Sequence, residues 1–471
     1  MRRAALSASL FVVHIPALIP HLIARDGRAE SGYDGSMQYT PPPGYPAPPP
    51  PHDPNGAFSR GPSGAGVPAL AVAAFGALAL AVVAMGAERF AYYGTRASLY
   101  ELTVRDGVPF ASVYTAAAFF TALGVLVGGV LAFALGPRLA GVIGATLAAA
   151  GCLACVVFGV WGYALVALGS GVFRVAPVAV MLEAIPSTGA RFRRVAAAAA
   201  AGYAVVDVVA FASSAFAMVR ANLGVSWGFG LGAAPFGVAA VLCGALLWMG
   251  PRAHLQTDER LELTAGPAGD PYRGGPGSRV VGAAPLDPGL LAALMGAHLI
   301  VSIVSALPYY PRALPSGSLF RGLETLVSIA ASAGLAAVLV TTPVRARSAH
   351  LFGVGLAVLA AGTVLRAVPL APAGALAQLV LAFGHSLVAA LGVAAFATRA
   401  PRRFGALAVA LWALVPTWFG FALRALPSSS ASESGASAGL AAAVAALGLV
   451  AAAVALGMLV FGERLQPGDD P

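Results

Sequence analysis

The chain has 471 residues, of which 59% are hydrophobic and only 10% are charged, with a formal net charge of +9. A water-soluble domain needs more charge than this to cover its surface, so a soluble protein is excluded. Apolar runs of about 20 residues recur, each long enough to cross a ~30 Å hydrocarbon core. They do not alternate as barrel strands do. The sequence therefore predicts an all-α polytopic protein of a lipid bilayer.

The first element in the chain is an N-terminal extension, residues 1–66. Its start, "MRRAALSASLFVVHIPALIPHLIA", resembles a signal peptide or a weak anchor, but two prolines make it a poor helix. The Pro-rich stretch that follows is typical of an extended or disordered tail. We expect residues 1–36 to be an over-extended gene start, with Met37 as the natural first residue; a mass spectrum of the native N-terminus tests this.

From residue 67 onward the apolar runs predict twelve membrane helices. The approximate spans are 68–102, 108–136, 139–160, 163–187, 195–218, 225–249, 288–310, 319–342, 349–369, 372–398, 404–425 and 436–461. A polar linker, 251–287, separates an N-terminal six-helix bundle (67–250) from a C-terminal one (288–462), and 463–471 form a tail. This arrangement predicts the major-facilitator architecture, whose substrate site lies between the halves.

The arginines predict the orientation of these helices. Thirteen lie in or beside the connections after helices 2, 4, 6, 8 and 10, against five at the alternate connections. The positive-inside rule places the first set, and both termini, in the cytoplasm. The positive net charge therefore indicates topology rather than nucleic-acid binding, and we expect a cell inner membrane location.

An uncharged run, Val67–Ala84, is followed by charged and aromatic residues on the same predicted helix. Ionisable residues inside a bilayer are costly and are functional candidates by default. Arg89, Tyr93 and Arg96 share one helix face, with Glu88 on the adjacent stripe. This pattern indicates either a cavity that attracts an anion or a helix end with arginines that reach the interface.

The same residues resemble a known family. "ERFAYYGTR" is similar to the first-helix signature ExxERFxYYG of the proton-dependent oligopeptide transporters, although Met85 replaces its first Glu. Further similarities follow in order in predicted helices 2, 4, 5, 6, 10 and 11. The resemblance implies a monomeric secondary transporter without a cofactor. It would carry di- or tripeptides, or related carboxylate-bearing small molecules, by proton-coupled alternating access.

The resemblance also implies a set of site residues. Arg96 and Arg174 would grip a carboxylate, and Glu88 would exchange arginine partners as access switches. The implied substrate-binding residues are Arg89, Tyr93, Arg96, Tyr114, Arg174, His385 and Trp412. The implied proton-coupling or gating residues are Glu88, Asp207 and Glu324.

Several positions depart from the family pattern. Arg174 stands where bacterial members have Lys, and His385 replaces the Glu that receives a peptide's ammonium group. Phe133 replaces the usual Asp of the motif between helices 2 and 3, and the predicted seventh helix lacks its coupling acid. From the residues alone, Asp207 is either a paired structural acid or a cavity acid. His385 is either a packed histidine or a cavity-lining one.

These departures motivate a second hypothesis. The chain would be a transport-incompetent relative that serves as a membrane receptor or scaffold, with the Pro-rich tail recruiting a partner. Flux through proteoliposomes separates the two hypotheses.

The sequence has no nucleophile–base set, nucleotide-binding loop or metal-ligand cluster, so we expect neither an enzyme nor a metal site. Cys152 and Cys155 have CxxC spacing but lie in an apolar run, which predicts packing.

Overall fold

The computed structural model of the chain describes residues 66–185, 191–220, 224–248, 295–296, 298–299, 318–341, 348–366, 368, 371–399 and 404–425, together with 436–465. The helices of the N-terminal half are α2 (Gly66–Arg105), α3 (Phe110–Leu135), α4 (Pro137–Phe158), the short η3 (Gly159–Trp161), α5 (Gly162–Ala184), α6 (Arg191–Arg220) and α7 (Val225–Trp248). Those of the C-terminal half are α10 (Ser318–Thr341), α11 (Ser348–Arg366), α12 (Ala371–Arg399), α13 (Gly405–Ala425) and α14 (Ala436–Leu465).

The helix bounds agree with the predicted spans to within four residues at each end. The exception is the span 288–310, most of which lies outside the described residues, as do the N-terminal extension before Gly66 and the linker 251–287. Among the described residues, seven continuous helical stretches are long and apolar enough to cross a membrane. One of them joins α4 to α5 through η3. The prediction of an all-helical polytopic membrane protein is confirmed.

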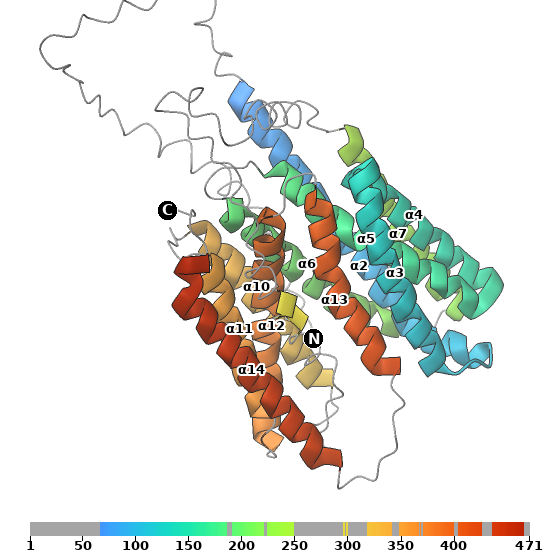
Figure 1. Ribbon diagram of the computed structural model, residues 1–471. Helices are drawn as coiled ribbons and strands as arrows, with labels where there is room; N and C mark the ends of the chain where they lie inside the picture. Colours follow the sequence, from blue (N-terminus) through green and yellow to red (C-terminus); the bar gives the residue numbers. More distant parts are fainter. Residues whose placement is uncertain are drawn as a thin grey trace, which may run out of the picture.

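The helices form two groups with an interface between them (Figure 1). In the first group α4 packs on α5 and α7, and α3 packs on α5. In the second, α11 packs on α12 and α14. Two helices make contacts across the interface. Helix α6 of the N-terminal half packs on α10 and α12, and helix α13 of the C-terminal half packs on α3 and α5. The residues of α6, α5 and α13 are therefore placed to form a site between the halves.

Small residues bring α3 and α5 into close contact. A Cβ atom on Gly124 would lie 2.2 Å from the carbonyl oxygen of Leu168, and one on Gly171 would lie 2.3 Å from that of Thr121. Membrane helices often approach through such small residues, because lipid tails supply little hydrophobic driving force between helices. This packing fixes the position of α5, which carries two polar residues of the site described below.

The two halves are in contact at the end predicted to be cytoplasmic. Phe133 of α3 stacks on Phe404, directly before α13, with ring centroids 5.6 Å apart and planes 5° apart. One turn away, a Cβ atom on Gly129 would lie 2.5 Å from the Cβ of Ala410. Phe133 stands at the position that is usually Asp in the motif between helices 2 and 3, and here it makes an aromatic contact across the interface.

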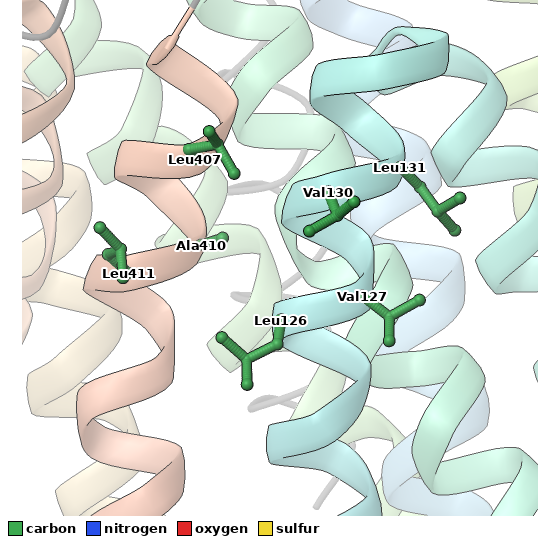
Figure 2. Close-up of a pocket in the computed structure, with 7 residues that line it drawn as sticks. All are labelled: Leu126, Val127, Val130, Leu131, Leu407, Ala410 and Leu411. Atoms are coloured by element: carbon green, nitrogen blue, oxygen red, sulfur yellow. The ribbon is translucent and has the colours of Figure 1, made fainter.

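An apolar groove of about 310 Å³ runs along the same contact between α3 and α13 (Figure 2). Several of its side chains are exposed on the surface of the bundle, including Val130 and Leu411. Its lining is Leu126, Val127, Val130, Leu131, Leu407, Ala410 and Leu411. A binding site for a polar solute needs convergent polar groups, which the described lining of this groove lacks. Such a surface suits the hydrocarbon chains of the bilayer.

Candidate functional site

A central cavity of about 450 Å³ lies between the two halves. Helices α2, α3, α5 and α6 line one side, and α10, α12, α13 and His298 line the other. Nine of the ten predicted site residues line it: Glu88, Arg89, Tyr93, Arg96, Tyr114, Arg174, Asp207, His385 and Trp412. Glu324 is not among the described lining residues; it precedes the lining residue Ser328 by one turn of α10.

Glu88 is fully buried and forms a compact polar cluster between α2 and α5. Its Oε2 lies 2.9 Å from the Nε of Arg89, and the hydroxyl of Ser170 donates a hydrogen bond to its Oε1. A buried carboxylate is tolerated where an opposite charge and hydrogen bonds compensate for its lost hydration. Both compensations are present, so the charge of Glu88 is balanced by Arg89 within the N-terminal half.

Tyr92, which is not among the predicted site residues, lies near two guanidinium groups. The Cζ of Arg89 is 5.5 Å from its ring centroid, and the Cζ of Arg174 is 5.7 Å from it. These are cation–π distances, and the aromatic ring partly offsets the burial of two like charges. The structure therefore brings Arg89 and Arg174 together around one tyrosine.

Arg174 also contacts the C-terminal half. Its Nη1 donates a long hydrogen bond of 3.4 Å to the hydroxyl of Thr417 on α13. Its Nε is buried and has no hydrogen-bond acceptor among the described residues. A buried donor without an acceptor is unfavourable. Arg174 therefore retains a donor that a ligand oxygen in the cavity could satisfy.

Arg96 lies over a different aromatic residue. Its Cζ is 4.7 Å from the ring centroid of Tyr114 on α3, and this ring stacks on Phe110 with centroids 5.6 Å apart. The sequence predicts that Arg96 and Arg174 grip one carboxylate. In the structure each contacts its own tyrosine, and Arg89 is the arginine that shares a ring with Arg174.

Asp207 of α6 is linked to the C-terminal half by two hydroxyl groups. Ser328 of α10 donates a hydrogen bond to its Oδ2, with the two oxygens 2.5 Å apart. The Oγ of Ser328 is in turn 2.7 Å from the Oγ of Ser386 on α12. Asp207 is thus both a cavity acid and a hydrogen-bonded one. The two serines were missed, although Ser386 directly follows His385 in the sequence.

The opposite wall of the cavity is built around Trp412, which is only 3% exposed. The ring of His298 stacks on its indole, with centroids 3.7 Å apart and planes 9° apart. The Nε2 of His298 lies 2.7 Å from the backbone carbonyl oxygen of Trp412. Pro416, four residues later, has no N–H to donate to that carbonyl. His298 supplies the missing donor, which places a hydrogen on Nε2 because a carbonyl only accepts.

His385 differs from His298 in its exposure. His298 is only 4% exposed, whereas His385 is exposed and lines the cavity. Of the two readings left open by the sequence, the structure favours a cavity-lining His385. An imidazole at this position offers a substrate one donor and one acceptor, without the fixed negative charge of a carboxylate.

The described lining of the cavity contains more positively charged side chains than negatively charged ones. Its described lining contains three guanidinium groups, those of Arg89, Arg96 and Arg174, and two carboxylates, those of Glu88 and Asp207. Among the described residues no group of three or more His, Cys, Asp or Glu is arranged to hold a metal ion. With neutral histidines the cavity carries an excess of positive charge, which favours an anionic ligand.

Neither the known protein families nor the curated proteins include a match to this sequence. Solved structures do match. The proton:xylose symporter XylE, bound to 6-bromo-6-deoxy-D-glucose, has a TM-score of 0.58 and 11% identity, covering 84% of this chain and 98% of the symporter. The human organic anion transporter MFSD10 (TETRAN) has a TM-score of 0.56 and 12% identity, covering 83% and 99%.

A POT family transporter in complex with a thioalcohol-conjugated peptide has a TM-score of 0.53 and 16% identity, covering 83% of this chain and 96% of that one. The resemblance to peptide transporters is therefore one of several structural likenesses of comparable strength. The three relatives share one architecture over most of this chain. The protein is a polytopic membrane protein with the major-facilitator fold that these structures share.

Proposed function

We propose that the protein is a secondary transporter that carries small carboxylate-bearing molecules, such as di- or tripeptides and their N-blocked derivatives, across the cell membrane. The observation that carries this proposal is the excess of arginine in the cavity between the halves. A buried positive charge is costly, and an anionic substrate offsets that cost. Alternating access then moves the bound substrate between the two sides.

The substrate carboxylate binds at Arg174. The guanidinium has a buried Nε–H without a described acceptor, and its planar fork matches the two oxygens of a carboxylate. Arg89, which contacts the same Tyr92 ring, adds positive charge but is already paired with Glu88. Arg96 and Tyr114 then lie further along α2 and α3 as contacts for the rest of the substrate.

The ligands named for the structural relatives give three candidate classes of substrate. XylE was solved with a neutral sugar derivative, MFSD10 is described as an organic anion transporter, and the POT relative was solved with a peptide conjugate. A neutral sugar would leave the arginine excess of this cavity uncompensated. The charge balance therefore favours an anion or a carboxylate-bearing peptide over a sugar.

Proton coupling is the second part of the proposal. Two carboxylates, Glu88 and Asp207, line the cavity, and each is hydrogen-bonded to a serine. A proton gradient can act on a transporter through an acid that gains and loses its charge inside the membrane. We therefore propose that the protons that drive transport bind to carboxylates that line the cavity.

Uptake into proteoliposomes tests the proposal. The purified full chain is reconstituted with an inward proton gradient and supplied with radiolabelled dialanine, N-acetyl-dialanine or D-xylose. We expect uptake of the peptides and none of the sugar. We further expect loss of uptake in Arg174→Ala but not in Arg105→Ala, a matched change at the exposed end of α2. Uptake of xylose alone, or saturable peptide binding without any flux, would overturn the proposal, the latter in favour of a receptor.

A further inference from the structure

The chain of hydrogen bonds from Asp207 through Ser328 to Ser386 is a direct polar link between the two halves. Asp207 belongs to α6 in the N-terminal half, while Ser328 and Ser386 belong to α10 and α12 in the C-terminal half. The hydroxyl of Ser386 can also donate to the carbonyl oxygen of Ala382 one turn earlier, at 2.9 Å. Alternating access requires the halves to move relative to each other, so this link must break or rearrange in each cycle.

The number of hydrogens in the chain allows two arrangements. When Asp207 is ionised it can only accept, so Ser328 donates to it and Ser386 donates to Ser328. When Asp207 is protonated it can itself donate to Ser328. Ser328 then donates to Ser386, and Ser386 donates to the carbonyl of Ala382. Both arrangements satisfy every hydroxyl, but only the first contains a hydrogen bond to a charged group.

The observed geometry fits the ionised arrangement. The 2.5 Å separation between Ser328 and Asp207 lies in the range of a hydroxyl that donates to a carboxylate. Charge-assisted hydrogen bonds are roughly twice as strong as neutral ones. Protonation of Asp207 would therefore keep the connection but weaken it.

Asp207 and Glu88 differ in their charged neighbours. Glu88 lies against Arg89, whereas the described residues offer Asp207 no arginine within ion-pair distance. Burial penalises a charged carboxylate, and a guanidinium partner offsets this penalty. Loss of the negative charge is therefore less costly at Asp207 than at Glu88, where it would leave Arg89 unpaired.

The other titratable groups around the link come from each helix that packs there. Tyr203 precedes Asp207 by one turn on α6, and Glu324 precedes Ser328 by one turn on α10. His385 adjoins Ser386 on α12. Glu88 and Arg89 of α2 and Arg174 of α5 face the same cavity. Of these, His385 is the residue that ordinarily titrates near neutral pH, so it is the rival sensor.

We propose that Asp207, Ser328 and Ser386 form a proton-operated latch between the two halves, closed when Asp207 is ionised and loosened when Asp207 takes up a proton. The latch extends the proposed function, because it identifies Asp207 as the acid on which the proton gradient acts. Ser328 lies outside the segments that suggested a peptide transporter, and Ser386 lies in the tenth-helix segment without being one of its matched residues. The latch acts on the conformational equilibrium even without a substrate.

A distance measurement without substrate tests the latch independently of transport. Spin labels are placed at Val241→Cys on α7 and Val460→Cys on α14, which are 72% and 59% exposed and lie in opposite halves. The three buried native cysteines are replaced by alanine. Double electron–electron resonance in lipid nanodiscs then compares the interlabel distances at about pH 5 and about pH 8, which bracket the change of charge expected of a buried carboxyl. Failure of peptide uptake would leave this measurement unaffected.

We expect acidification to shift the ratio of the two conformers of the otherwise unaltered protein on the order of five-fold, as the loss of one charge-assisted bond implies. Asp207→Asn should give the acidic distribution at both pH values, and Ser328→Ala should remove most of the shift. Asp106→Asn, the same chemical change outside the cavity, should leave the shift intact. A pH-dependent shift that survives in Asp207→Asn would overturn the latch, and so would the absence of any shift in the unaltered protein. Survival of the shift in Asp207→Asn together with its loss in His385→Asn would assign the sensing to the histidine.

Discussion

The two walls of the central cavity differ in kind. The N-terminal half supplies every charged side chain of the described lining: Glu88, Arg89, Arg96, Arg174 and Asp207. The C-terminal half supplies hydroxyls, two imidazoles and an indole: Ser328, Ser386, Thr417, His298, His385 and Trp412. The charged wall is therefore suited to hold a substrate anion, and the neutral wall to close over it.

This difference also sets the cost of opening the cavity. Strong contacts, such as the buried pair of Glu88 and Arg89, lie within one half and need not break when the halves move. The described hydrogen bonds between the halves in the cavity are single hydroxyl contacts, at Thr417 and at Ser328. Each of these bonds involves one charged group, and such a hydrogen bond contributes about 1.5–3 kcal/mol. Among the described residues, the halves can therefore separate without breaking an ion pair.

The largest effect is expected from the charged wall. Arg174→Ala should weaken binding of N-acetyl-dialanine on the order of 100-fold, because the substrate carboxylate loses a buried partner. Arg174→Lys should retain part of the affinity, since it keeps the charge but not the planar fork. Isothermal titration measures both. Equal affinity in all three proteins would remove Arg174 from the site, and Arg105→Ala controls for loss of positive charge elsewhere.

A second prediction separates binding from switching within the charged wall. Glu88→Gln leaves Arg89 without its ion-pair partner, so the affinity for anions should hold or rise. Transport should slow about ten-fold, because the extra positive charge retains the substrate; this corresponds to about 1.4 kcal/mol. Paired binding and proteoliposome uptake assays check this. Normal transport at every pH would make Glu88 a structural ion-pair member only.

The neutral wall gives a third prediction, about substrate choice. His385 lacks the negative charge that would hold a peptide's ammonium group, so dialanine should have little advantage over N-acetyl-dialanine. His385→Glu should move the preference toward the free amine by about ten-fold, the size of one modest ionic contact. Competition between the two peptides measures the change. A protein that already strongly prefers dialanine with His385 in place would contradict this role.

The smallest effect is expected outside the cavity, at Asp106 between α2 and α3. Its Oδ1 accepts a hydrogen bond from the Nε of Arg105 at 2.8 Å, and its Oδ2 accepts one from the N–H of Val160 at 2.7 Å. The hydrogen bond from Arg105, joined by that from Val160, holds the pKa of Asp106 below its usual value against the opposing effect of burial. Folding therefore favours the ionised form at this position.

Because the pKa of Asp106 is lower in the folded chain, its contribution is present above the unfolded value of about 3.9 and is lost as pH falls through the folded value. Asp106→Asn should lower the free energy of unfolding at neutral pH by about 1 kcal/mol. The difference should shrink on acidification. Thermal unfolding in detergent at about pH 7 and about pH 3, on either side of that value, checks this. A difference that grows in acid would reverse the assignment.

The sequence predicts the helices well because hydropathy and length decide which segments can cross a bilayer. It also predicts much of the charged wall, since ionisable residues in apolar runs are rare enough to stand out. Ser170, Ser328 and Ser386 could not be selected in this way. A serine is common in membrane helices, and only the packing of the helices shows that Ser170 and Ser328 bond to carboxylates and that Ser386 contacts Ser328.

The partners of each charge were also beyond the sequence. A helix pattern shows that Arg89 and Arg96 share a face of α2, but not which residue of another helix each one meets. The pairing of Arg174 with Tyr92 depends on how α5 packs against α2, and that of Arg96 with Tyr114 on how α3 packs against α2. His298 was similarly hidden, because its role depends on a carbonyl that Pro416 leaves without a donor.

The central claim is that the arginines of the N-terminal half bind the carboxylate of the substrate. The most direct measurement compares N-acetyl-dialanine with its neutral N-methylamide by isothermal titration, in the unaltered protein and in Arg174→Ala. The unaltered protein should prefer the carboxylate on the order of 100-fold, and the variant should lose most of that preference, since the cycle isolates the contact between the two charges. Equal binding of both compounds to the unaltered protein, or an undiminished preference in the variant, would contradict the account.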